Sequence, residues 1–123
     1  MIQGIVTARP EIRIRLPILD VTGYEQEFDV VLDTGFTGLL TLPTALIASL
    51  QLPWVMVSRV QFADGRVEWI DKYRMTVIWD GVYRSIEVQA IEGDPLIGME
   101  LLIGFDLRAR VAIGGIVEIE AIP

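Results

Sequence analysis

The chain of 123 residues contains no cysteine and no histidine. Without cysteine it has neither a disulfide framework nor a thiolate nucleophile. Without histidine, no Ser-His-Asp or Cys-His arrangement can form, and the usual zinc sites lose their ligands. We therefore expect no metal and no cofactor. Any acid–base chemistry near neutral pH must come from carboxylates, lysine or tyrosine.

Basic clusters and long apolar runs are also missing. The net charge is −7 and the ten Lys and Arg residues are scattered, which argues against nucleic acid because phosphates need clustered cations. No stretch approaches the roughly 18 uncharged apolar residues of a membrane-spanning helix. The first residues, MIQGIVTARPEIRIRL, lack the apolar core of a signal peptide, so we expect a cytoplasmic protein.

The residues that are present predict one globular domain over 1–123, mostly β with one or two short helices. Hydrophobic residues make up 52% of the chain, enough for a core. In EIRIRL, residues 11–16, aliphatic side chains alternate with charged ones, which predicts a strand with one apolar face. A turn at 20–23 and a strand over 24–32 follow. Pro43 is suited to the first turn of a short helix over 43–50.

Two Asp-Gly pairs lie between strand-like runs, and this dipeptide is a strong signal for a two-residue hairpin turn. The second pair, at 80–81, then places Trp79 opposite Val82. The first pair, at 64–65, gives its ribbon one apolar side. That side is made of Val60, Phe62, Val67 and Trp69.

The C-terminal part predicts one more helix and one more hairpin. The segment GMELLIGF, residues 98–105, is compatible with a short helix. The segment RVAIGGIVEIEAI, residues 110–122, is typical of a hairpin that turns at Gly114-Gly115.

Residues 30–36, VVLDTGF, raise the question of function. An apolar run ends in Asp33, and Asp followed by Gly is common in ordinary turns, so one interpretation is purely structural. The other is catalytic. A single carboxylate does little acid–base work near neutral pH, but two that share a proton can activate water and protonate a leaving group. The chain has one such motif, so a symmetric dimer with Asp33 on its two-fold axis would supply the second.

Three motifs, taken in order, resemble a known family. They are Leu32-Asp33-Thr34-Gly35, the hairpin at residues 64–65, and Leu96-Ile97-Gly98 followed by MELL. Together they resemble the single-domain, homodimeric retropepsin-like aspartic proteases, which include the retroviral proteases and their bacterial relatives. The resemblance covers roughly residues 10–110. It implies a closed, barrel-like β half of an acid protease with a flap hairpin.

The resemblance also implies a role for each matching residue. Asp33 is the expected catalytic carboxylate, Thr34 links the two loops across the dimer, and Gly35 allows close approach of the substrate backbone. Residues 96–98 support the loop from beneath. The flap residues expected to contact substrate are Phe62, Ala63, Asp64, Gly65 and Arg66.

Two departures from the family pattern bear on function. Phe36 stands where many members have Ala or Ser, and it either narrows the cleft or packs. The flap tip is charged, so substrate preference does not transfer from the retroviral enzymes. The predicted function is a homodimeric aspartic endopeptidase that hydrolyses a peptide or protein. The alternative is a non-catalytic dimerisation or peptide-binding module on the same fold.

Overall fold

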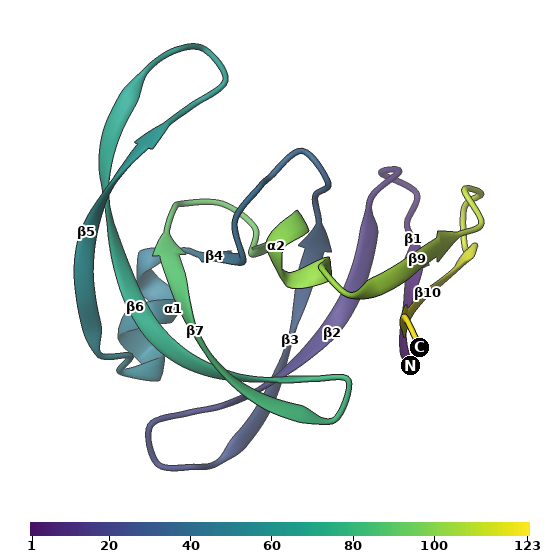
Figure 1. The fold of residues 1–123 in the computed structure, drawn as a ribbon, viewed down its shortest axis with the longest axis horizontal. Helices are drawn as coiled ribbons and strands as arrows, with labels where there is room; N and C mark the ends of the chain where they lie inside the picture. The colour runs from purple at the N-terminus through teal and green to yellow at the C-terminus, as the bar shows by residue number, and fades with distance from the viewer.

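One large sheet and two short helices account for the regular structure in the computed structural model, which describes all 123 residues (Figure 1). The expected mostly β architecture with short helices is confirmed. No helix has the length and apolar character needed to cross a bilayer. The helices are α1 (Thr44–Leu50) and α2 (Met99–Leu102). The strands are β1 (Ile2–Val6), β2 (Ile12–Leu19), β3 (Glu25–Leu32), β4 (Leu40–Leu42), β5 (Trp54–Gln61), β6 (Val67–Trp79), β7 (Val82–Ala90), β8 (Leu96–Ile97), β9 (Phe105–Ala109) and β10 (Ile116–Ala121).

The middle of the sheet curves into a ring. The strands pair in the order β2, β3, β8, β4, β7 and β6, and β6 returns to pair with β2. Only two residue pairs make this closure, Ile18 with Val77 and Leu19 with Thr76. β5 extends the sheet beyond β6, and β1, β10 and β9 extend it beyond β2. Figure 1 shows β5 and β6 leaving the ring together as a long ribbon, while β9 and β10 lie near the two termini.

β2 and β3 bring the chain through the core to the candidate site. The alternation expected for residues 11–16 is confirmed, since every second side chain from Ile14 to Ile18 is buried. β3 changes character along its length: residues 25–27 are exposed, whereas Val30–Leu32 are buried. The strand therefore carries the backbone from solvent into the core and emerges at Asp33.

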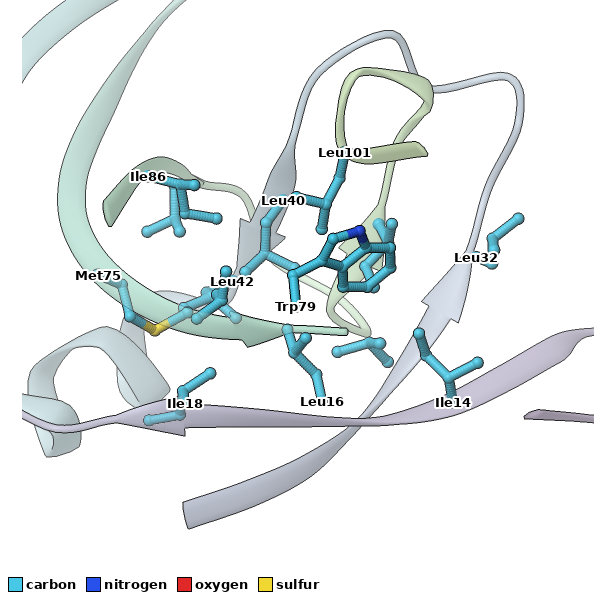
Figure 2. Close-up of a cluster of buried hydrophobic side chains, with 14 of the residues drawn as sticks. Ile14, Leu16, Ile18, Leu32, Leu40, Leu42, Met75, Trp79, Ile86 and Leu101 are labelled. Atoms are coloured by element: carbon cyan, nitrogen blue, oxygen red, sulfur yellow. The ribbon is translucent and has the colours of Figure 1, made fainter. Parts of the chain in front are cut away.

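Trp79, at the end of β6, is the largest side chain in the core and is 1% exposed. It packs edge-on against Phe105, with ring centroids 5.9 Å apart and an interplanar angle of 76°. Figure 2 shows it among aliphatic side chains from several elements, including Leu16, Leu40 and Leu101. Burial of apolar surface stabilises the fold by about 25 cal/mol per Å². Because Trp79 is the last residue before the turn between β6 and β7, its burial fixes that turn to the core.

α1 begins one residue after Pro43, which confirms the expected helix over 43–50. Pro43 is the N-cap, with extended backbone angles, and has no side chain that could cap the helix. The carboxylate of Glu92 takes that role, accepting from the Thr44 N–H at 3.1 Å and from the Thr44 hydroxyl. The hydroxyl bond is the main reason that the pKa of Glu92 lies below its usual value. A left-handed residue, Gln51, ends the helix.

The turn at Asp80-Gly81 has the expected form. Trp79 lies opposite Val82 in the register between β6 and β7. Asp80 and Gly81 both have positive φ, 52° and 76°. That combination defines the two-residue type I′ turn, whose twist suits a hairpin.

The turn at Asp64-Gly65 differs from the prediction. Phe62 pairs with Arg66, because the Phe62 N–H donates to the Arg66 carbonyl at 2.8 Å. The loop therefore has three residues, 63–65, and only Gly65 has positive φ, at 87°. The expected register of β5 against β6 is wrong by one residue.

This slip redistributes the side chains of the β5–β6 ribbon. Val60 lies opposite Glu68, so these two residues and Phe62 share one side, and all three are half-buried. Val67 and Trp69 lie on the other side, where Trp69 is 70% exposed. The expected single apolar side made of Val60, Phe62, Val67 and Trp69 is therefore wrong.

The C-terminal hairpin exists, but its turn is not at Gly114-Gly115. β9 pairs with β10 through Ala109 opposite Val117, and a five-residue loop, 111–115, joins the strands. β1 holds the end of this loop, since the Val6 N–H donates to the Gly115 carbonyl at 2.9 Å. A Cβ on the buried Gly115 would collide with the Arg110 carbonyl oxygen. Gly115 therefore permits this close approach within the hairpin, whereas Gly114 supplies a positive φ of 80°.

Candidate active site

Asp33 follows directly on the buried end of β3 and begins a tight turn. Its N–H donates to the carbonyl of Ile97 at 2.9 Å, and its carbonyl accepts from the Phe36 N–H at 3.1 Å. Its half-buried side chain accepts one hydrogen bond, from the Gly35 N–H to Oδ1 at 2.9 Å. The chain offers no ion pair and no further side-chain hydrogen bond to this carboxylate, so Oδ2 is available to a ligand.

The segment 96–98 lies against the loop that begins at Asp33. β8 pairs in parallel with β3, which places Leu32 beside Ile97, and it pairs antiparallel with β4. Beyond β8, the Gly98 N–H donates to the Leu39 carbonyl at 3.0 Å, and the Met99 N–H donates to the Phe36 carbonyl at 2.8 Å. The backbone of residues 33–39 is thus tied at several points to a single supporting segment.

Phe36 packs into this support. A Cβ added to Gly98 would lie 2.6 Å from the Phe36 ring and would collide with the Gly38 carbonyl oxygen. A Cβ on Gly38 would also lie 2.6 Å from the same ring. Both glycines are therefore needed so that the ring and the two backbone segments can approach one another. Of the two alternatives open for Phe36, packing is what the contacts show, although the residue also lines the cleft described next.

A cleft of about 400 Å³ separates the Asp33 loop from the β5–β6 ribbon. Among the flap residues expected to contact substrate, Phe62 and Ala63 line it, whereas Asp64, Gly65 and Arg66 do not. From the expected catalytic triplet only Gly35 lines the cleft; Asp33 and Thr34 lie outside its lining. The full lining consists of Gly35, Phe36, Thr37, Gly38, Val60, Gln61, Phe62, Ala63, Gln89, Ile91 and Glu100.

The charged tip of the β5–β6 ribbon, predicted as a flap, makes its contacts within that ribbon. The Arg66 guanidinium lies 4.8 Å from the centre of the Phe62 ring and 3.1 Å from the Glu68 carboxylate. The Arg66 N–H donates to the Asp64 carboxylate at 2.9 Å. Arg66, the first residue after the loop, therefore contacts Phe62 across the ribbon and both Asp64 and Glu68 along the chain. The contact with Phe62 fits the observed register, in which Phe62 and Arg66 are the pair next to the loop.

Apart from sequence neighbours of the predicted loop and hairpin residues, three lining residues were not predicted: Gln89, Ile91 and Glu100. Gln89 and Ile91 belong to the end of β7 and its continuation, which β4 brings beside the loop by pairing with Gln89. Glu100 follows Gly98 and donates its N–H to the Gly38 carbonyl at 3.2 Å. Only the position of Glu100, in the MELL segment that follows the Leu96-Ile97-Gly98 motif, offered a signal in the sequence.

A larger hollow of about 470 Å³ lies elsewhere, between β1, β2 and the Asp80-Gly81 turn. None of the expected site residues lines it. One wall is held by an ion pair of 2.7 Å between the Met1 ammonium and Asp80. Its size alone does not make it the candidate site, because it brings together no expected catalytic group.

No three or more Cys, His, Asp or Glu side chains gather anywhere in the structure as a metal ion would require. No protein-family model, no curated protein and no solved structure matches the chain. The interpretation of the site therefore rests on the residues and contacts given above.

Proposed function

We propose that the protein is an aspartic endopeptidase that acts as a homodimer and that the ring is a closed, barrel-like acid-protease half of the retropepsin type. The observation that carries the proposal is the placement of Asp33. Its carboxylate stands at the mouth of a buried strand, on a loop tied to residues 96–98, beside a cleft covered by a hairpin. An ordinary surface turn needs neither a supporting segment hydrogen-bonded to it nor a cleft beside it.

The chemistry needs two copies of Asp33. Two carboxylates a few Å apart cannot both ionise easily, so one holds a proton and the other is a base. In the proposed reaction the ionised Asp33 takes a proton from water, whose oxygen bonds to the scissile carbonyl carbon. Asp33 of the partner subunit gives its proton to the carbonyl oxygen. The C–N bond then breaks as the leaving nitrogen takes up a proton from one Asp33, while one hydroxyl of the diol returns its proton to the other, so that the pair again holds one proton.

The neighbours of Asp33 suit supporting roles in this reaction. Thr34 is exposed and its hydroxyl makes no hydrogen bond within the chain, so it is free to bond the partner's loop. Gly35 lines the cleft and is exposed, so a substrate backbone can approach it closely. The β5–β6 ribbon would close over the peptide and exclude bulk water.

An exposed group of aliphatic side chains supports the docking of a second copy. Val111 and Ile113, in the loop between β9 and β10, are 81% and 78% exposed. Ile5 and Ile116 lie opposite each other in neighbouring strands and are also exposed. Figure 1 shows this loop at the same upper edge as the loop after β3 and the tip of the flap. We call these four residues the aliphatic patch, and such patches are typical of interfaces.

A second candidate function is a peptide-binding module without catalysis. The observation that favours it is that Asp33 and Thr34 do not line the cleft within one chain. The Gly35 N–H bond to Asp33 Oδ1 is also what a structural Asp makes when it stabilises its own turn. On this alternative the cleft binds an extended peptide, and Asp33 only shapes the loop.

Replacing Asp33 with Asn separates the two candidates. We expect Asp33→Asn to lower peptidase activity by about 10³-fold or more. The amide of Asn can neither accept nor donate the proton that the two carboxylates share. Circular dichroism and the dimer mass should be unchanged. Asp29→Asn, on the strand that leads to Asp33, is the matched control, since it disturbs only an exposed ion pair with Arg15. Undiminished cleavage by the Asp33 variant would overturn the endopeptidase.

The dimer is tested at the aliphatic patch. We expect Ile113→Asp to shift the protein from dimer to folded monomer in sedimentation velocity and to abolish cleavage, because a charge in an apolar interface is costly. Val21→Asp is the control, since Val21 is 53% exposed in the turn between β2 and β3. A protein that is monomeric at concentrations where it cleaves would contradict the shared pair.

A further inference from the structure

The cleft carries charge of one sign only. Among its lining residues Glu100 is the only one that carries a charge, and no Lys or Arg lines the cleft. Gln89 adds a second acceptor, because its Oε1 is buried and has no hydrogen-bond partner. A buried acceptor without a partner costs free energy, and a ligand that brings a donor removes this cost. The cleft therefore favours a ligand that brings an N–H donor to Gln89 and Glu100.

The carboxylate of Glu100 is free to bind such a ligand. Glu100 is exposed and makes no ion pair in the structure, although its backbone is fixed by the bond to the Gly38 carbonyl. Glu100 also lines a second hollow, together with Arg74 and Arg84. Arg74 instead contacts Glu87 at 3.5 Å, and Arg84 has no carboxylate within ion-pair distance. Neither arginine therefore forms an ion pair with Glu100, whose carboxylate can still pair with a ligand.

Apolar contacts beside these acceptors suit a long aliphatic stem. Phe36, Val60, Phe62 and Ile91 line the same cleft. Lysine and arginine side chains bury their methylene groups along apolar surface while the charged end reaches an acceptor. A cationic side chain satisfies the apolar walls and the two acceptors at once, whereas an acidic one would meet Glu100 with like charge.

We propose that the cleft selects a peptide with a lysine or arginine side chain, which Glu100 and Gln89 bind at its charged end. This inference rests on the proposed function, since it takes the cleft as the peptide site of an endopeptidase. The net charge of −7 would also attract a basic peptide to the protein at low ionic strength.

Binding to an inactive variant tests the inference separately from catalysis. The protein carries Asp33→Asn, and the probes are octapeptides of alanine and leucine with one lysine, norleucine or glutamate placed at each position in turn. Affinity is measured by fluorescence anisotropy at low and high salt. At one position we expect the lysine peptide to bind about three- to fivefold more tightly than its norleucine analogue, and less so at high salt.

Two further variants, made in the same inactive background, assign the preference to the cleft. Glu100→Gln should remove it, leaving the lysine and norleucine peptides within about 1.5-fold of each other. Gln89→Met, which keeps the side-chain length but loses the acceptor, should weaken only the lysine peptide. Glu25→Gln, which removes an equal charge from the exposed start of β3, should change nothing.

The outcomes distinguish this inference from the proposed function. A lysine preference that survives Glu100→Gln, or no preference at any position, overturns the inference. Cleavage by the intact protein without a preference for basic peptides overturns it too, and leaves the endopeptidase standing. A preference that depends on Glu100 in a protein that cleaves nothing supports the inference and favours the peptide-binding module.

Discussion

The two Asp-Gly turns carry the same dipeptide and have different structures. At Asp80-Gly81 both residues have positive φ and the turn has two residues. At Asp64-Gly65 only the glycine has positive φ, and Ala63 joins the loop. Asp-Gly is compatible with both forms, because a type I turn that ends in a left-handed glycine also closes a hairpin. The dipeptide predicts that the chain turns, but it does not predict the register.

Burial decides the register where the dipeptide does not. Beside Asp80-Gly81, Trp79 is in the core, so a slip of one residue would expose it to solvent. In the flap, apolar residues occur on both sides of the ribbon, and neither register gains a large burial. The observed pairing instead brings Arg66 over the Phe62 ring and next to Glu68.

The largest expected difference between the two ribbons is in their tryptophans. We expect Trp79→Ala to lower the free energy of unfolding by about 3–5 kcal/mol, since it leaves a cavity in the core. Trp69→Ala should change it by less than about 0.5 kcal/mol because the side chain is exposed. Urea unfolding followed by circular dichroism measures both. Similar losses for the two variants would show that the flap is packed as firmly as the core.

The turn glycines should differ by a smaller amount. Gly81→Ala forces an alanine into a left-handed conformation and should cost about 1 kcal/mol. Gly65→Ala should cost less than about 0.5 kcal/mol of global stability, because the flap tip can open locally while the ring stays folded. Gly81→Asn is the control for conformation, since Asn tolerates positive φ, and it should recover most of the loss. Equal costs at Gly81 and Gly65 would contradict the local opening of the flap.

The smallest effect is expected when Ala63 is deleted. The remaining Asp64-Gly65 then forms a two-residue turn between Phe62 and Arg66 without any slip of the strands. Stability should change by less than about 0.5 kcal/mol, and nuclear Overhauser contacts should still pair Val60 with Glu68. Ala63→Ser controls for the loss of the side chain alone. Contacts between Val60 and Trp69 would show instead that the dipeptide sets the register.

Local patterns in the sequence were enough to predict several elements of the fold. Alternation placed β2, the apolar run placed the end of β3, and Pro43 placed α1. The turn of the last hairpin could not be placed in this way. Gly114-Gly115 is a strong turn signal, but here the loop is also hydrogen-bonded to Val6 of β1, through the Gly114 N–H and the Gly115 carbonyl. Such pairing depends on residues far apart in the chain.

The candidate site shows the same limit. Asp33, its loop and the segment 96–98 were predicted from their motifs, and their contact is present in the structure. Of the flap residues predicted to contact substrate, Phe62 and Ala63 line the cleft, whereas Asp64, Gly65 and Arg66 do not. Gln89 and Glu100 carry no motif of their own. They reach the cleft through the pairing of β4 with β7 and through the backbone of α2.

The two residue pairs that close the ring also affect how the chain folds. Ile18 and Val77 are fully buried yet far apart in the sequence, and only they and Leu19 with Thr76 join β2 to β6. Hairpins such as β2–β3 and β6–β7 have local contacts and form early, whereas this closure carries the entropy cost of a long loop. We expect the seam between β2 and β6 to form late. Substitutions there should then mainly speed unfolding and leave the rate of folding nearly unchanged.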